Sequence, residues 1–206
     1  VREPTVFLLD EPLSNLDAKL RAAARDDLLE FQRRVGITTI YVTHDQVEAL
    51  TMSTSIAVMK EGVLQQVDAP DAVYRTPANL FVADFVGNPK INLLRGRVAS
   101  EGVVDLGHFS VQVPTHGASG EVVVSVRPED VAISREPVAG APEFVAYSVL
   151  PAGADTTIVA HHNGLEITAK EAGISEIAMD DRIWLTFRTE MLNLYDADSG
   201  NLVAPF

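Results

Sequence analysis

The chain has no cysteine and no long apolar run, and each absence excludes a class of protein. Without cysteine there are no disulfides and no thiolate metal sites, which fits a reducing compartment. No apolar stretch approaches the roughly 18 residues that a membrane-spanning helix needs, and no secretory signal precedes the first predicted strand. We therefore expect a chain that stays in water and meets a membrane only through a partner.

Clusters of basic residues are also missing. The 206-residue chain has 16 Lys and Arg against 29 Asp and Glu, a net charge of -13, and acidic residues outnumber basic ones in both halves. Binding a nucleic-acid backbone requires clustered positive charge, so we expect no nucleic-acid partner. With 47% hydrophobic residues, the chain is typical of a globular protein with one large or two small domains.

The first strong pattern is an apolar run that ends in two acids. Residues 5–9 carry no charge and are mostly large and apolar, and Asp10, Glu11 and Pro12 follow them directly. An uninterrupted apolar run that stops at a turn predicts a strand buried on both faces, as in parallel α/β sheets. Ligand-binding groups collect at the carboxyl ends of such strands, so Asp10 and Glu11 are candidate site residues.

A helix and a second strand follow the acidic turn. Residues 16–35 carry apolar side chains every three to four positions and predict an amphipathic helix. Its N-cap would be Asp17 or Asn15. Residues 37–43 are rich in β-branched side chains and predict a second buried strand, with His44 directly after it. We expect His44 to lie close to the two acids at the end of the first strand.

Smaller elements are predicted beyond this point. A short helix, a hairpin and two further helices are expected over residues 45–52, 55–67, 70–74 and 78–86. From residue 93 onward, short alternating segments separated by Gly, Pro and Asn-Gly turns predict a small antiparallel barrel. His161 and His162 precede Asn163-Gly164 and are expected at a hairpin tip. They are poor joint metal ligands, because adjacent side chains of a strand point to opposite faces.

Three motifs, in order along the chain, resemble the second half of an ABC-transporter ATPase domain. Its Walker B strand corresponds to Val6, Phe7, Leu8 and Leu9, its D-loop to Ser14, Asn15, Leu16 and Asp17, and its switch histidine to His44. Residues 71–87 resemble the end of this domain in sugar-importer subunits. Arg127-Pro128-Glu129-Asp130 and the segment 194–200 resemble their appended OB-like domain. The resemblance implies an α/β ATPase half over residues 1–88, followed by an all-β, OB-like (TOBE-type) domain over residues 89–206.

The resemblance also implies roles for the candidate residues. Asp10 would hold Mg²⁺ through water, and Glu11 would be the general base that orients the water attacking ATP. His44 would bond a γ-phosphate oxygen. Residues 14–17 would reach across a dimer as the D-loop, although the same residues are also what any capped helix needs.

Several motifs of the family are absent. The chain contains no G-x-x-x-x-G-K-[ST] loop, no Q-loop glutamine and no LSGGQ signature, and it starts at Val1. We therefore expect a fragment that by itself neither binds nor hydrolyses ATP appreciably. We also expect residues 1–88 to pair with another chain, to accompany an N-terminal piece or to rearrange locally, because the first strand lacks its neighbours.

The expected partners follow from the family. The intact protein would be an ATPase that forms a homodimer and binds membrane-spanning permease subunits at the cytoplasmic face of the membrane. A regulatory protein could bind its C-terminal domain, and sugars, sugar phosphates or polyols would be the cargo. Two alternatives stay open. The first is a non-transport ABC ATPase with basic surfaces, and the second is a barrel whose main role is to bind an oxyanion, another small ligand or a regulatory protein.

Overall fold

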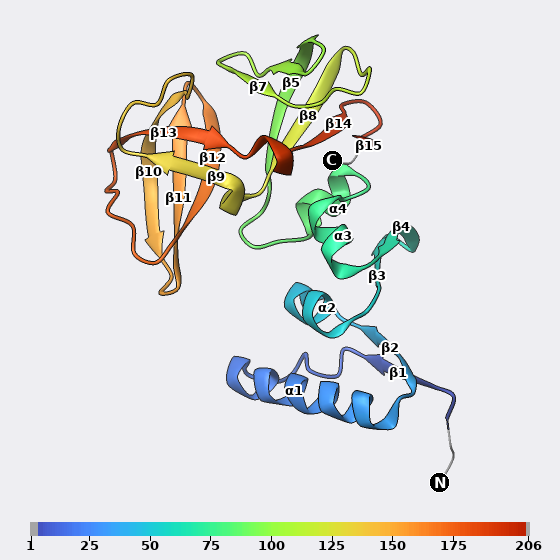
Figure 1. Cartoon of the computed structure of the whole chain (residues 1–206). Helices are drawn as coiled ribbons and strands as arrows, with labels where there is room; N and C mark the ends of the chain where they lie inside the picture. The colour runs from blue at the N-terminus through green and yellow to red at the C-terminus, as the bar shows by residue number, and fades with distance from the viewer. Residues whose placement is uncertain (1–3, 205–206) are drawn as a thin grey trace. The chain divides into compact units, whose positions relative to one another are not determined.

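The computed structural model describes residues 4–204, and the chain divides into two compact units (Figure 1). The first unit extends to Ala72 and the second begins at Val73, so the division falls within helix α3, Pro70–Arg75. The described residues are mostly β structure. No helix among residues 4–204 is long and apolar enough to cross a bilayer.

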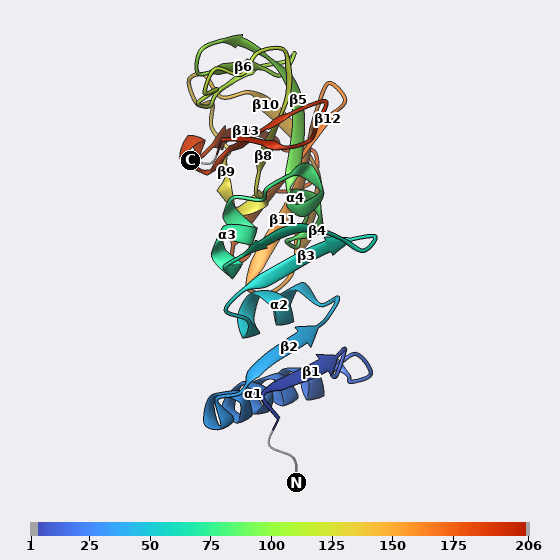
Figure 2. The same cartoon turned by 90° about the vertical axis from the view of Figure 1, so that its right-hand side faces the viewer.

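The first unit begins with a β–α–β arrangement. Strands β1, Val6–Asp10, and β2, Thr38–Val42, are parallel, and helix α1, Ala18–Val35, connects them (Figure 2). The register runs from the pair Val6 and Thr38 to the pair Asp10 and Val42. Parallel strands need a crossover of this kind, because a tight turn can only reverse the chain.

Helix α1 covers one face of this two-stranded sheet and leaves the other open. The rings of Phe7 and Phe31 lie 6.0 Å apart, centroid to centroid, on the covered face. On the other face four apolar side chains are exposed: Val6 by 46%, Leu8 by 69%, Ile40 by 54% and Val42 by 45%. The prediction of strands buried on both faces is therefore wrong for this structure. Alternate residues of a strand face opposite ways, and only one side has a covering element.

Local signals set the limits of α1. The Asp17 carboxylate accepts a hydrogen bond from the Leu20 amide at 2.9 Å. Of the two N-cap candidates, Asp17 is therefore the residue that caps the helix. At the other end Gly36 has φ of 68°, and its amide donates to the Gln32 carbonyl at 2.8 Å. Glycine adopts this left-handed conformation without steric cost, which is why the helix stops there.

The remaining elements of the first unit match their predicted types. Helix α2, Gln46–Met52, is capped by Asp45, and strands β3, Ile56–Lys60, and β4, Val63–Asp68, form an antiparallel hairpin. Glu61 and Gly62 connect the two strands with φ of 49° and 79°. Positive φ at both turn residues suits the right-handed twist of a hairpin.

The second unit contains helix α4, Leu80–Phe85, and eleven strands among its described residues. A six-stranded sheet has the order β15-β14-β8-β5-β6-β7, and a five-stranded sheet has the order β12-β11-β10-β13-β9. Their bounds are β5 Asn92–Ser100, β6 Val103–Asp105, β7 Ser110–Gln112, β8 Glu121–Val126, β9 Val131–Ser134, β10 Glu143–Pro151, β11 Asp155–His162, β12 Leu165–Ala172, β13 Arg182–Phe187, β14 Asn193–Asp196 and β15 Leu202–Ala204.

All named strand pairs of this unit are antiparallel, as expected for residues 89–206. The edge strands β9 and β12 of the five-stranded sheet also contact each other, so this sheet curls toward a barrel. One apolar core joins both sheets and includes Phe144 and Ile158, exposed by 1% and 0%. The OB-like identity of the domain stays a prediction.

Helices α3 and α4 are fixed to the second unit by the turn at Arg127. The Arg127 guanidinium, 4% exposed, donates to the carbonyls of Tyr74, at 2.8 Å, and Val86, and lies 4.1 Å from the Tyr74 ring centroid. Tyr195 donates from its hydroxyl to the Pro77 carbonyl at 3.1 Å. The compact unit thus starts before residue 89. The boundary between functional domains at residues 88 and 89 stays a prediction.

Candidate functional site

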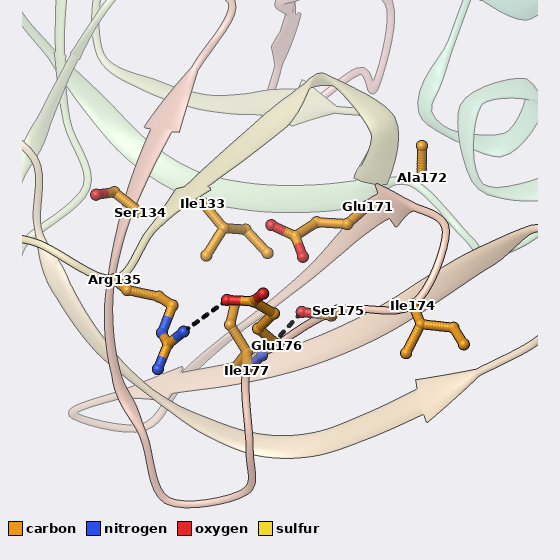
Figure 3. A pocket seen from close by; sticks show the side chains of 9 residues that line it. All are labelled: Ile133, Ser134, Arg135, Glu171, Ala172, Ile174, Ser175, Glu176 and Ile177. Atoms are coloured by element: carbon orange, nitrogen blue, oxygen red, sulfur yellow. Dashed lines mark hydrogen bonds and ion pairs between the residues drawn. The ribbon is translucent and has the colours of Figure 1, made fainter.

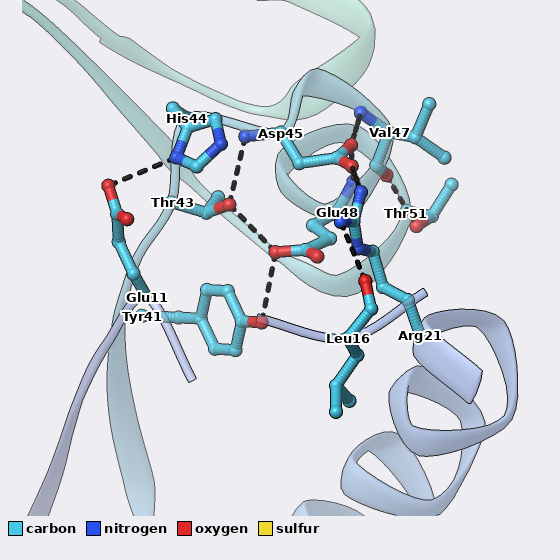
Figure 4. Close-up of polar contacts among 10 residues, drawn as sticks. All are labelled: Glu11, Leu16, Arg21, Tyr41, Thr43, His44, Asp45, Val47, Glu48 and Thr51. Atoms are coloured by element: carbon cyan, nitrogen blue, oxygen red, sulfur yellow. Dashed lines mark hydrogen bonds and ion pairs between the residues drawn. The ribbon is translucent and has the colours of Figure 1, made fainter. Parts of the chain in front are cut away.

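The predicted acids and the predicted histidine lie at one edge of the β1–β2 sheet. Asp10 ends β1, and the next amide, Glu11 N–H, donates to the Val42 carbonyl at 2.9 Å, which continues the parallel register. The Glu11 Oε1 and His44 Nδ1 atoms are 3.0 Å apart (Figure 4). Both side chains are open to solvent, with exposed fractions of 46% and 71%. The structure therefore brings Glu11 and His44 together, as the sequence analysis expected.

Glu11 has an unusual backbone conformation for its residue type. Its φ is 44°, in the left-handed region that side chains with a Cβ avoid. The turn is held by the Glu11 carbonyl, which accepts from the Ser14 hydroxyl at 2.9 Å and from the Ser14 amide at 3.3 Å. Such strain is concentrated at functional sites, and here it turns the Glu11 side chain out of the strand and toward His44.

Asp10 offers a carboxylate at the same edge, and oxygen ligands of this kind suit Mg²⁺. Among residues 4–204 no three His, Cys, Asp or Glu side chains form a group that could hold a metal ion. Mg²⁺ characteristically keeps several waters and takes its other ligands from substrate phosphates, so a single carboxylate fits it. Asp10 as the Mg²⁺ residue stays a prediction.

The loop after Glu11 is organised for the start of α1. Leu13 is 4% exposed and anchors the loop, and the Leu16 amide donates to the Leu13 carbonyl at 3.2 Å. Asp17 then caps the helix. The helix-cap reading of residues 14–17 is therefore correct for Asp17. Their use as a D-loop, which concerns Ser14, Asn15 and Leu16 as well, stays a prediction.

Glu48 is a part of the site that the sequence analysis missed. Its side chain is 4% exposed, and its Oε2 atom accepts hydrogen bonds from the Tyr41 hydroxyl at 3.0 Å and the Thr43 hydroxyl at 2.7 Å. Burial, followed by the hydrogen bond to Glu48, raises the pKa of Tyr41 well above its ordinary value, so this hydroxyl stays a donor.

A sequence signal for Glu48 does exist. Asp45 and Glu48 have the spacing of a capping box, in which the glutamate would bond back to the amide of the cap residue. The Asp45 carboxylate does cap α2, accepting from the Val47 and Glu48 amides at 2.8 and 3.2 Å. The Asp45 amide instead donates to the Thr43 hydroxyl at 2.9 Å, which frees the Glu48 carboxylate for Tyr41 and Thr43.

Arg21 connects the loop before α1 to the segment after His44. Its Nη2 atom donates to the Leu16 carbonyl at 3.0 Å, and its Nη1 atom lies 3.4 Å from Oδ2 of Asp45 (Figure 4). The position of Leu16 is thereby linked to the residue next to His44. The sequence analysis did not single out Arg21.

Comparisons with known proteins agree with these motifs. The chain is 41% identical to the trehalose/maltose import ATP-binding protein MalK of Thermococcus litoralis and 39% identical to the sn-glycerol-3-phosphate import ATP-binding protein UgpC of Escherichia coli K12. Both alignments cover 98% of this chain and 58% of the relative, so the chain spans little more than half the length of these proteins. The chain is homologous to the ATP-binding subunits of sugar-importer ABC transporters.

The importer resemblance drawn from the motifs is thus confirmed. A family model described as the CysA C-terminal regulatory domain matches residues 92–133, which run from β5 into β9 and include the turn at Arg127. A solved structure of the cytoplasmic molybdate-binding protein ModG has a TM-score of 0.42 and 15% identity, covering 50% of this chain and 94% of that one.

The second unit has an open pocket of about 640 Å³ beside β9 and β12 (Figure 3). Ile133 and Ile177 supply apolar lining, and Glu171 points into the space. Arg135 is paired with Glu176 at 3.0 Å. One cation against two carboxylates does not make the strongly basic pocket that an oxyanion ligand would require.

The adjacent histidines lie where the sequence analysis expected them. They end β11, and Asn163 and Gly164, with φ of 47° and 85°, form the turn to β12. The rings face different partners: His161 Nε2 lies 3.0 Å from a Glu166 oxygen, and His162 Nδ1 lies 2.6 Å from the Glu143 carbonyl. The hairpin-tip assignment is confirmed.

Proposed function

We propose that this chain is part of the ATP-hydrolysing subunit of an ABC importer and that Asp10, Glu11 and His44 form its hydrolytic edge. The observation that carries the proposal is the 3.0 Å contact between Glu11 and His44, beside Asp10, at the shared end of two parallel strands. Glu11 accepts a proton from the attacking water and orients it. His44 donates to a γ-phosphate oxygen from its second ring nitrogen, in the doubly protonated form that has a donor on both nitrogens while Nδ1 faces Glu11. Mg²⁺ at Asp10 supplies charge neutralisation when it is bound.

The test is ATP hydrolysis by a subunit that carries this segment together with a phosphate-binding loop. Glu11→Gln or His44→Ala is expected to lower kcat by about 10²- to 10⁴-fold, the usual contribution of a positioned acid or base. Glu30→Gln is the matched control, because Glu30 is exposed on α1 and pairs with Arg34. Unchanged hydrolysis in both site variants would refute the assignment.

We further propose that the 206-residue chain by itself has no appreciable ATP affinity. The sequence contains no glycine-rich loop and lysine to hold the β- and γ-phosphates, and these groups supply most of the nucleotide affinity in this class of protein. Isothermal calorimetry with Mg-ATP is expected to give no binding heat at micromolar concentration. Micromolar binding would require a nucleotide site elsewhere in the chain.

The proposed complex is a homodimer bound to membrane permease subunits at the cytoplasmic face. Residues 14–17 would reach the partner's nucleotide as the D-loop, and residues 89–206 would serve dimerisation and regulation, including the binding of a regulatory protein. Sugars, sugar phosphates or polyols are the proposed cargo, by analogy with the importers named above. Co-purification with a permease, and loss of uptake of one such solute on deletion, are the tests.

The open face of the β1–β2 sheet supports this assembly. Four exposed apolar side chains on one sheet face are costly in water and mark a surface that another element covers. We propose that an element of another chain packs on this face. A monomeric chain in which β1 is fully protected from hydrogen exchange while its open face stays solvated would contradict this.

A further inference from the structure

The buried carboxylate of Glu48 lies beneath the segment that carries His44. It accepts hydroxyl hydrogen bonds from two residues that precede His44, Tyr41 three positions before it and Thr43 directly before it. Thr43 in turn accepts from the Asp45 amide, directly after His44. A chain of hydrogen bonds from one carboxylate oxygen therefore fixes residues 41–45 (Figure 4).

The His44 side chain has no comparable support of its own. It is 71% exposed, and it contacts Glu11, which is itself 46% exposed. A contact between two exposed side chains is weak by itself, because rotamer entropy opposes it. The position of the His44 ring therefore depends on its backbone, and its backbone depends on the groups that bind Tyr41, Thr43 and Asp45.

Helix α2 contributes the stiffness of this support. Asp45 caps the helix through the Val47 and Glu48 amides, so the backbone of Glu48 is tied to the same segment that its carboxylate holds. An unsatisfied buried carboxylate costs considerable free energy, which disfavours any backbone arrangement that breaks the two hydroxyl bonds. The helix and the loop are consequently linked through both the backbone and the carboxylate of Glu48.

We propose that Glu48 is a positioning residue that sets the orientation of His44 toward Glu11. Its relevance to catalysis rests on the proposed role of His44, but the positioning itself does not. The requirement is an oxygen that accepts two hydroxyl hydrogen bonds at this place, and not a negative charge. Glu48→Gln retains such an oxygen, whereas Glu48→Leu leaves both hydroxyls without an acceptor.

The test follows the imidazole of His44 by long-range ¹H–¹⁵N NMR in the 206-residue chain, with the signal assigned through His44→Ala. At pH values where the ring is neutral, donation to Glu11 from Nδ1 fixes the Nδ1–H tautomer, whereas a free imidazole favours Nε2–H. We expect the Nδ1–H form to dominate in the wild type and in Glu48→Gln, and to become the minor form in Glu48→Leu. The nuclear Overhauser effect between the His44 ring and the Glu11 side chain should disappear with it.

Two single-hydroxyl variants keep the proposal testable if Glu48→Leu does not fold. Thr43→Val removes two bonds of the chain and should shift the tautomer further than Tyr41→Phe, which removes one. Thr51→Val is the matched control, since the Thr51 hydroxyl donates to the Val47 carbonyl of the same helix and takes no part in this network. A folded Glu48→Leu or Thr43→Val chain with a wild-type His44 signal would overturn the proposal, as would an equal shift in Thr51→Val.

The same variants in an intact ATP-binding subunit separate this proposal from the proposed function. A displacement of about 1 Å at a reacting group costs about 10²-fold in rate, so Glu48→Leu should lower kcat by about that factor and leave KM for ATP little changed. If the His44 signal moves while kcat stays at the wild-type value, Glu48 positions His44 and the catalytic role of His44 is wrong.

Discussion

The two units of the chain bury their apolar side chains very differently. In the first unit, among the described residues, Leu13 and Val58 are the buried apolar side chains, at 4% exposure each. In the second unit one core connects both sheets, and side chains such as Phe144, Ile158 and Leu185 are exposed by 1% or less. Both units nonetheless consist of regular helices and strands.

The difference teaches that regular elements and a packed core have separate causes. Caps, turns and β-branched runs produce the helices and strands of the first unit, and these signals act over a few residues. Burial needs a second layer against each apolar face, and residues 4–204 supply none against the open face of β1 and β2. The second unit supplies both layers from its own sequence.

The largest expected effect tests this contrast with two phenylalanines. Phe144→Ala should destabilise the second unit by about 3–5 kcal/mol, because it empties a filled core site. Phe31→Ala, at a residue 49% exposed on α1, should cost only about 1 kcal/mol. Urea unfolding followed by the fluorescence of Trp184, the single tryptophan, reports the second unit. If Phe31→Ala shifted this transition as much as Phe144→Ala does, the two units would not unfold separately.

A second test removes the buried arginine of the second unit. Arg127→Leu leaves the carbonyls of Tyr74 and Val86 without their donor, and the expected cost is about 3 kcal/mol. Arg97→Leu is the control, because Arg97 forms an exposed pair with Glu121 at 2.9 Å, and its loss should cost under ~1 kcal/mol. Equal costs for the two substitutions would mean that the turn at Arg127 does not hold the helices.

A third test uses alkaline pH. Burial raises the pKa of Tyr195 to about 12, and burial followed by the hydrogen bond to Glu129 raises that of Tyr74 to about 12. The unfolded chain therefore releases these protons near the ordinary value of 10.0, before the folded chain does. The stabilisation is complete below pH 10 and is lost as the pH rises to 12, by roughly 2 kcal/mol for the fully buried Tyr195.

Urea midpoints measured by circular dichroism across this pH range check the alkaline test. Tyr195→Phe should lower stability at neutral pH, through the lost bond to Pro77, and flatten the alkaline slope. Tyr147→Phe, at a residue 61% exposed, should leave the slope as it is. A wild-type slope in Tyr195→Phe would assign the alkaline loss to other groups.

Much of this structure could be predicted from local sequence signals. The type of each element up to residue 86 was correct, because caps at Asp17 and Asp45, turns at Gly36 and Gly62 and the alternation of apolar residues act locally. The closeness of Glu11 and His44 also followed, since parallel strands align their carboxyl ends. Their catalytic roles remain predictions.

The sequence could not predict what covers each face or which buried polar groups pair. An apolar strand pattern is the same whether its second face meets protein or water, so the exposure of Leu8 was missed. Glu48 was missed because its partners Tyr41 and Thr43 are set by the tertiary packing of α2 against β2. Arg127 was recognised as a motif, but its contacts with residues 74 and 86 depend on the fold of the whole second unit.

The smallest expected effect is the loss of the N-cap of α1, in the unit with few buried side chains. Asp17→Ala removes the hydrogen bond to the Leu20 amide, and the expected cost to α1 is about 1 kcal/mol. Asp17→Asn retains an accepting oxygen and should recover most of it, and Asp26→Ala, at an exposed position within the same helix, should change little. Hydrogen exchange of the α1 amides measures this directly.

With so few buried side chains in the first unit, a change of this size should raise exchange throughout α1 and leave the strands of the second unit unaffected. Exchange confined to the first turn would instead mean that α1 has more tertiary support than its exposed face indicates.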